Sequence, residues 1–108
     1  MKVMISQPMA GKTDKEIAAT REKAIKFLEE KGYKVVDSYF KKEFAYKEQI
    51  NGNKMEHIPV YFLSKSLEKM SMCNAVFFCS GWQYYRGCKI EHEVALAYGL
   101  KCLYEEGV

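Results

Sequence analysis

Short apolar runs divide the chain and predict the strands of a sheet. They occupy residues 2–6, 33–37, 75–79 and 101–104. The third run is apolar throughout, which is typical of a strand that is covered on both faces. The first run ends at Gln7-Pro8, where proline cannot donate to a strand ladder.

Amphipathic stretches between these runs predict three helices. The first begins at Thr13, which forms the spacing of a capping box with Glu16, and ends at Gly32. The second begins at Pro59, because proline is favoured in a first helical turn, and the third ends at Gly99. The expected core-facing stripes are Ile17, Arg21, Ala24, Ile25 and Leu28 in the first helix, Val60, Leu63, Leu67 and Met70 in the second, and Ile90, Val94 and Ala97 in the third.

This alternation predicts an α/β fold in a single domain over residues 1–108. We expect an open, doubly wound parallel sheet of about four strands, flavodoxin- or Rossmann-like, with helices on both faces. Residues 38–58 lack clear periodicity and contain a turn signal at residues 51–53. We interpret them as a lid, a binding loop or an oligomer contact, with room for a short helix within residues 41–49.

Composition narrows the class of partner. The net charge of +3 permits an anionic small ligand but lacks the basic bias of a protein that binds duplex nucleic acid. Neither a signal peptide nor a membrane-spanning run is present, which favours a cytoplasmic protein. The four cysteines form no CxxC pair, so we expect buried free thiols and neither a metal site nor a cofactor.

The first candidate site is the loop at residues 7–13, beyond a strand's carboxyl end. Gly11-Lys12-Thr13 suggests a P-loop. The P-loop pattern requires a glycine five positions before Gly11, and that position is occupied by Ser6, so the interpretation fails. The loop still precedes a helix N-terminus, where backbone N–H groups and Lys12 could hold an anion. The alternative is an ordinary turn with a solvated lysine.

The second candidate site is the loop at residues 81–87. Its aromatic residues Trp82, Tyr84 and Tyr85 could stack on a base or sugar, or could cover the edge of a small core. Arg86 suits a phosphate or carboxylate. Asp37, at the end of the second strand, is the best remaining carboxylate for proton transfer, although a capping or turn role is as plausible.

The third helix carries two candidate carboxylates. Glu91 and Glu93 lie roughly 200° apart around a helix, so geometry alone does not choose between them. Glu91 is expected in the first helical turn. There its negative charge could simply stabilise the helix dipole, or the dipole could keep the carboxylate ionised so that it can act as a nucleophile. His92 is expected to face solvent.

Two blocks of sequence resemble a known group of proteins. They are VMISQPMAG at residues 3–11 and GWQYYRGCKIEHEVALAYG at residues 81–99. The chain is similar to the nucleoside 2-deoxyribosyltransferase-like superfamily, and more narrowly to its short DUF4406-type branch. The resemblance covers nearly the whole chain except residues 38–58.

The resemblance implies cleavage or transfer of the N-glycosidic bond of 2′-deoxynucleosides or their 5′-monophosphates. Counting back from Gly99 places Glu91 at the position of the family's nucleophile, which forms a deoxyribosyl-glutamate intermediate. Asp37, from its place at the end of the second strand, is the second expected catalytic residue. Asn74 stands where relatives usually carry Asp, and an amide cannot act as an acid. The alternative is therefore a nucleotide-binding module without catalysis. The expected substrate-binding residues are Ser6, Gln7, Pro8, Met9, Gly11, Lys12, Asn74, Gly81, Trp82, Tyr85, Arg86 and Gly87. A homodimer or higher homo-oligomer is also expected.

Overall fold

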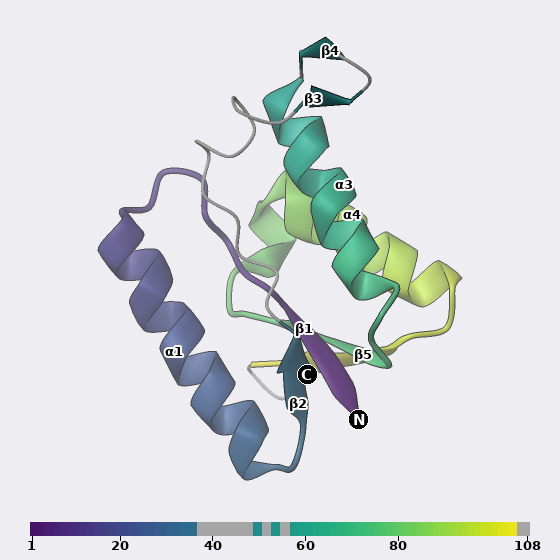
Figure 1. Cartoon of the computed structure of the whole chain (residues 1–108). Coiled ribbons are helices and arrows are strands. Elements are labelled where there is room, and N and C mark those ends of the chain that lie inside the picture. Colours follow the sequence, from purple (N-terminus) through teal and green to yellow (C-terminus); the bar gives the residue numbers. More distant parts are fainter. Residues whose placement is uncertain (37–48, 51–52, 55–56, 106–108) are drawn as a thin grey trace.

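The main sheet of the computed structural model (Figure 1) has four parallel strands in the order β2-β1-β5-β6. The structure describes residues 1–36, 49–50, 53–54 and 57–105. The strands are β1 (Lys2–Ser6), β2 (Lys34–Val36), β5 (Ala75–Phe78) and β6 (Lys101–Tyr104). Each of the four predicted strands is therefore confirmed to within one residue at either end, as is the α/β class.

Helices cover both faces of this sheet, as predicted. Helix α1 (Asp14–Glu30) lies on one side, and α3 (Ile58–Met70) and α4 (Arg86–Ala97) lie on the other (Figure 1). A separate antiparallel pair, β3 (Gln49–Ile50) and β4 (Asn53–Lys54), flanks the predicted turn. Asp37 and the possible helix within residues 41–49 lie outside the described residues, and so does most of the segment interpreted as a lid or oligomer contact.

Helix α1 forms as its sequence pattern predicts. The capping box is complete: the Glu16 N–H donates to Thr13 Oγ1 at 3.1 Å, and the Thr13 N–H donates to Glu16 Oε1 at 3.2 Å. Ile17, Ala24 and Leu28 of the predicted stripe are buried. Ala24 and Leu28 pack onto the side of β1 and β5 that carries apolar side chains only, namely Val3, Ile5, Ala75 and Phe77.

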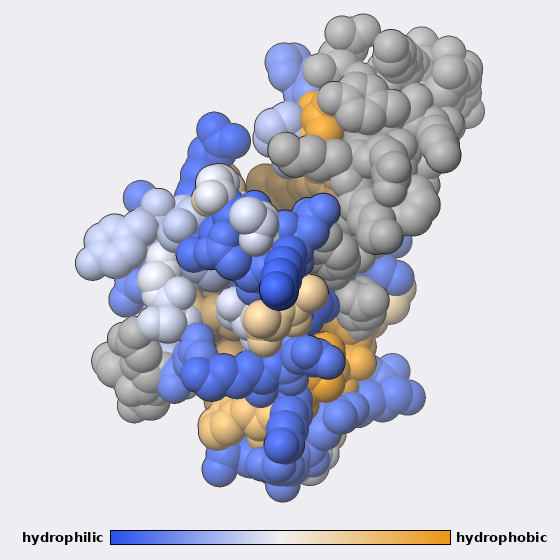
Figure 2. Space-filling view, turned by 90° about the vertical axis from the view of Figure 1, so that its left-hand side faces the viewer, coloured by the Kyte–Doolittle hydropathy of each residue, from blue (hydrophilic) through white to orange (hydrophobic). Residues whose placement is uncertain are grey.

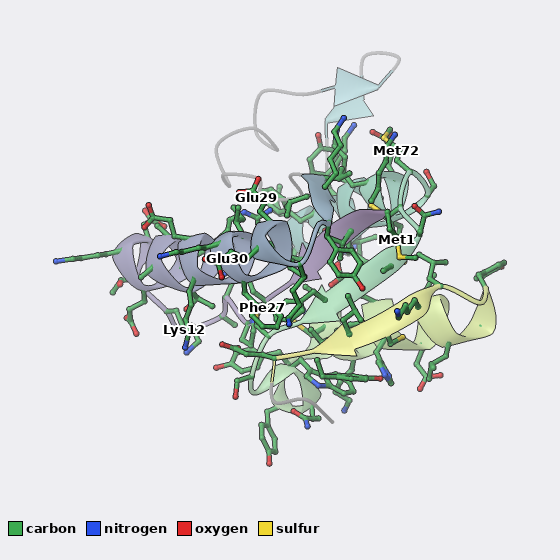
Figure 3. All side chains as sticks on the ribbon, turned by 90° about the horizontal axis from the view of Figure 1, so that it is seen from below. Met1, Lys12, Phe27, Glu29, Glu30 and Met72 are labelled. Carbon is green, nitrogen blue, oxygen red and sulfur yellow. The ribbon has the colours of Figure 1, made fainter. Side chains whose placement is uncertain are left out.

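Figure 2 shows the molecule from the α1 side. Hydrophilic side chains cover much of the described surface on this face, and a hydrophobic area remains in its lower half. Phe27 is 43% exposed, although its ring centroid lies 5.7 Å from that of Phe77. Figure 3 places Phe27 on the side of α1 that faces the sheet.

The predicted core-facing stripe of α4 is wrong at Ile90 and Ala97, and Val94 alone of its three residues packs against the core. Cys88, Glu91 and Ala95 are buried, whereas Ile90 is 38% exposed and Ala97 is exposed. The helix is rotated because the small side chains of Cys88 and Ala95 let it approach the sheet closely, and because Glu91 finds hydrogen-bond partners there. The predicted end of the helix is confirmed, since Gly99 adopts a φ of 74°.

Helix α3 shows a smaller correction of the same kind. It buries Tyr61 and Met70, while Val60 of the predicted stripe is 62% exposed. Pro59 does lie in the first turn, as expected. Among the described residues, neither α1, α3 nor α4 combines the length and apolar character needed to cross a bilayer.

Candidate active site

The order of the strands identifies where a ligand is expected to bind. From β1 the chain passes through α1 to β2 on one side, whereas β5 pairs with β1 on the other side. The winding of the sheet therefore reverses between β1 and β5. In open α/β sheets the crevice beyond the carboxyl ends of the strands at this point is the usual ligand site.

A buried carboxyl group lies at this switch point. Ser6, the last residue of β1, is 1% exposed, and Glu91 of α4 is 8% exposed. The Ser6 hydroxyl donates to Glu91 Oε1 at 2.5 Å across 85 residues of sequence. Ser66 of α3 hydrogen-bonds the same carboxyl group. Three elements thus converge on one glutamate.

This environment acts on the Glu91 carboxyl in opposite directions. Burial raises the pKa of Glu91 above its ordinary value, and the hydrogen bonds from Ser6 and Ser66 partly counter that rise. The expectation that Glu91 lies in the first helical turn is wrong, because α4 already begins at Arg86. The effect of the helix dipole falls off within one turn, so the hydroxyls of Ser6 and Ser66, and not the dipole, stabilise the Glu91 carboxylate.

The structure separates Glu91 from its neighbours on α4. Glu93 is exposed, so the two glutamates occupy different environments. His92 does not face solvent as predicted: its Nε2 and the Tyr104 hydroxyl are 2.7 Å apart, and its ring lies 4.2 Å from that of Trp82. The rotation that turns Glu91 toward β1 also brings His92 over the neighbouring strands.

The loop between β1 and α1 is fixed by Gln7. The buried Gln7 amide donates from Nε2 to the Ile17 carbonyl at 3.1 Å and accepts from Arg21 Nη1 at 2.9 Å. Pro8 is also buried, whereas Met9 is exposed. Gln7 therefore supports the loop from inside, and its amide is engaged with α1.

The rest of this loop is open to solvent. Gly11 has a φ of 78°, and the Lys12 N–H closes a turn onto the Met9 carbonyl at 3.1 Å. Lys12 is exposed. Figure 3 shows its side chain extending away from the ribbon at the beginning of α1. The loop thus offers a cation at the carboxyl edge of the sheet.

The loop between β5 and α4 differs from its prediction. Gly81 has a φ of 86° and is followed by a short 3-10 helix, η1 (Trp82–Tyr84). Arg86 and Gly87 lie in the first turn of α4 and are exposed, so they are not loop residues. Tyr85 is half-buried and has extended backbone geometry that allows α4 to begin directly after it.

Asn74 does not join the other predicted residues. It precedes β5, and its Oδ1 accepts a hydrogen bond from the Lys2 N–H at 3.0 Å. It therefore lies at the amino edge of the sheet, one strand length (about 13 Å) from the carboxyl edge. The second predicted catalytic residue, Asp37, follows β2 but lies outside the described residues.

A cavity of about 310 Å³ opens at the carboxyl ends of β5 and β6. Ser6 pairs with Phe78, and Phe78 pairs with Tyr104, so these residues form one row across the sheet on the α4 side. Glu91 contacts the β1 end of the row, and the cavity lies at its β6 end. The cavity is lined by Phe78, Ser80, Gly81, Trp82, Gln83, Tyr104 and Glu105.

Sequence reasoning missed several of these residues. Tyr104 and Glu105 lie at the carboxyl end of β6, and the rule that sites gather at the carboxyl ends of strands is the signal that identifies them. Ser66 gives no local signal, because a serine in an amphipathic helix is ordinary. Only the packing of α3 against α4 reveals its role.

The four cysteines are free, as predicted, but Cys73 and Cys102 are only half-buried, whereas the prediction had all four buried. Cys79 and Cys88 are buried, and burial is the main cause that raises the pKa of Cys79 to about 12 and that of Cys88 to about 11. Both are therefore neutral thiols at physiological pH and poor nucleophiles. Within the part of the chain that the structure describes, no cluster of His, Cys, Asp or Glu could hold a metal ion.

Comparison with known proteins gave one result. A family model described as "Domain of unknown function (DUF4406)" matches residues 1–104. No match was found among curated proteins or among solved structures.

Proposed function

This chain belongs to the DUF4406 family, and from that premise we propose that it cleaves the N-glycosidic bond of 2′-deoxynucleosides or their 5′-monophosphates. Glu91 is the nucleophile. The observation that carries the proposal is the Glu91 carboxyl, buried at the switch point of the sheet and bonded to Ser6 at 2.5 Å. The likeness to nucleoside 2-deoxyribosyltransferases adds the substrate class.

The reaction has two displacements. A Glu91 oxygen attacks C1′ as the C1′–N bond breaks, and the departing base takes the electron pair and then a proton from solvent. Water next attacks C1′ and loses its proton, which releases the Glu91 carboxylate and a free deoxyribose or its 5-phosphate. A second base in place of water gives transfer. Two inversions retain the configuration at C1′.

Burial suits this chemistry. The transition state for glycosidic cleavage carries oxocarbenium-like positive charge, and a carboxylate in a poorly solvated site stabilises such charge more strongly than one in water. The raised pKa of Glu91 is the cost of keeping that charge out of water. Hydroxyls from Ser6 and Ser66 favour the ionised form that a nucleophile requires.

Two exposed cations flank this edge of the sheet and suit a 5′-phosphate. Lys12 lies in the β1–α1 loop, and Arg86 begins α4. Helix α4 begins beyond the carboxyl end of β5, so the backbone N–H groups of its first turn lie at this edge. No side chain caps them, which leaves them able to bind a phosphate. Arg86→Ala is expected to weaken monophosphates far more than nucleosides, whereas Lys89→Ala, which removes the same charge from the same helix, is not.

The decisive experiment is chromatography of free base released from a panel of deoxynucleosides and deoxynucleoside 5′-monophosphates. We expect Glu91→Gln to reduce release by at least about 10³-fold, because no other group replaces a nucleophile. Glu93→Gln, the same change at an exposed position on the same helix, is the control. Intact-protein mass spectrometry should detect the deoxyribosyl adduct in wild type only. Unchanged release in Glu91→Gln would refute the assignment.

A nucleotide-binding module is the second candidate, and the limited access to Glu91 favours it, because C1′ must reach the carboxyl for the attack to occur. Only 8% of Glu91 is exposed, so a bound nucleotide has little access to its carboxyl. If the whole panel gives no free base while calorimetry detects nucleotide binding, the module is the correct description.

A further inference from the structure

We propose that the cavity at the carboxyl ends of β5 and β6 binds the substrate's base, and that Glu105 selects bases presenting two adjacent N–H donors. Guanine is the nucleobase with that edge. The identification of the ligand as a nucleobase rests on the proposed function. The cavity and its donor preference rest on the residues that line it.

Aromatic rings form the walls of the cavity. The ring centroid of Trp82 lies 5.2 Å from that of Phe78 and 5.8 Å from that of Tyr104. Its contact with His92, at 4.2 Å, holds the indole in place. Rings fixed in this way form a platform for a planar ligand, and stacking a base on such a ring contributes about 1–3 kcal/mol.

Glu105 supplies the polar group at the rim. Its Oε1 accepts a hydrogen bond from the Ser80 N–H at 2.7 Å, and its own N–H donates to the Phe78 carbonyl at 3.0 Å. Lys23 Nζ lies 3.7 Å from Oε2. The Ser80 N–H therefore holds the carboxylate at the end of β5, and the exposed Lys23 side chain lies near its second oxygen.

A carboxylate accepts hydrogen bonds and donates none, so the ligand edge that meets it must carry donors. Guanine presents N1–H and the 2-amino group side by side, which match two carboxylate oxygens. Adenine and cytosine each place a ring-nitrogen acceptor beside the amino group, and thymine flanks its single N–H with two carbonyls. Those acceptors would face the negative charge of Glu105.

Size and position agree with this assignment. A volume of about 310 Å³ is at the lower end of the range for small-molecule sites, which suits a base with part of its sugar. The cavity and Ser6 are separated by two strand spacings, about 10 Å, along the row through Phe78. The cavity therefore lies at the same edge of the sheet as Glu91, which does not itself line it.

Trp82 provides the probe, because it is the only tryptophan in the chain. Its fluorescence should be titrated with dGMP, dAMP, dCMP and dTMP, in wild type and in Glu91→Gln, which prevents turnover. We expect dGMP to bind most tightly. Glu105→Gln should weaken dGMP by about 10–100-fold, as loss of a charged hydrogen-bonding partner does, and change dTMP by less than about threefold. Glu93→Gln is the matched control, and Glu105→Asp serves if the glutamine variant misfolds.

The outcomes separate this inference from the proposed function. Equal affinities for the four nucleotides, unchanged in Glu105→Gln, would overturn the selectivity. Absence of any Trp82 response, together with base release that depends on Glu91, would overturn the cavity site and leave the proposed function standing. A Trp82 response that depends on Glu105, with no base ever released, would support the site and refute the catalysis.

Discussion

The two faces of the sheet are built on different principles. On the α1 side, Leu28 and Ala24 pack onto Val3, Ile5 and Phe77, and the helix is oriented as its apolar spacing predicts. On the opposite side, α4 turns a glutamate toward the sheet and leaves Ile90 partly exposed. The first face is an ordinary core, and the second combines a core with a polar site.

This difference indicates which forces position each helix. An apolar stripe alone is sufficient to orient α1. The orientation of α4 depends in addition on the hydrogen bonds of Glu91 to Ser6 and Ser66, and on the small Cys88 and Ala95 beside it. Departures of this kind, where a polar group replaces an apolar one in the core, are expected at functional sites.

The largest effect is expected on the α1 side. Leu28→Ala removes a fully buried side chain and leaves a cavity, so it should lower the free energy of unfolding by about 2–5 kcal/mol. Urea denaturation followed by circular dichroism measures it. Phe27→Ala, on the same helix but 43% exposed, should cost clearly less. Equal losses for the two would show that α1 does not pack as described.

A polar substitution on the other face should cost somewhat less. Ser6→Ala leaves the buried Glu91 carboxyl without one of its donors, and we expect a loss of about 1–3 kcal/mol. Because the Ser6 hydrogen bond lowers the pKa of Glu91, its removal raises that pKa further and moves the acid limb of any pH–rate profile to higher pH. Ser64→Ala, at an exposed position on α3, is the control, and an equally small effect for both would contradict the Ser6–Glu91 contact.

Replacing the glutamate itself should have the opposite sign. The pKa of Glu91 is raised in the folded protein, so the stability that it contributes is full below 4.5 and is lost as the pH rises through the folded value. Glu91→Gln removes this penalty and should stabilise the protein at pH 7 by about 1 kcal/mol, while activity falls. Thermal denaturation at pH 7 and at pH 4 measures it, and the gain should shrink at the lower pH. A gain that is independent of pH would contradict the burial of an ionised carboxyl.

The same contrast explains what the sequence could predict. Strand positions, the capping box at Thr13 and the class of sheet depend on local patterns, which the sequence displays directly. The position of Glu91 depends on a contact with Ser6 that spans 85 residues, and no local pattern reports it. Helical spacing gave Ile90, Val94 and Ala97 as the buried stripe because apolar periodicity takes no account of a carboxyl that is satisfied inside the core.

The smallest effect therefore tests the orientation of α4 most directly. Ala97→Gln and Ala95→Gln are the same substitution two positions apart, and the predicted stripe and the structure assign opposite outcomes to them. Ala97 is exposed, so its replacement should change the free energy of unfolding by less than about 0.5 kcal/mol. Ala95 is fully buried against Met4, Val76 and Phe78, and a glutamine there should overpack the core and cost at least about 1–3 kcal/mol. Chemical denaturation of the two variants side by side measures both changes. A larger loss of unfolding free energy for Ala97→Gln than for Ala95→Gln would mean that α4 buries the predicted apolar stripe and that Glu91 does not lie in the core.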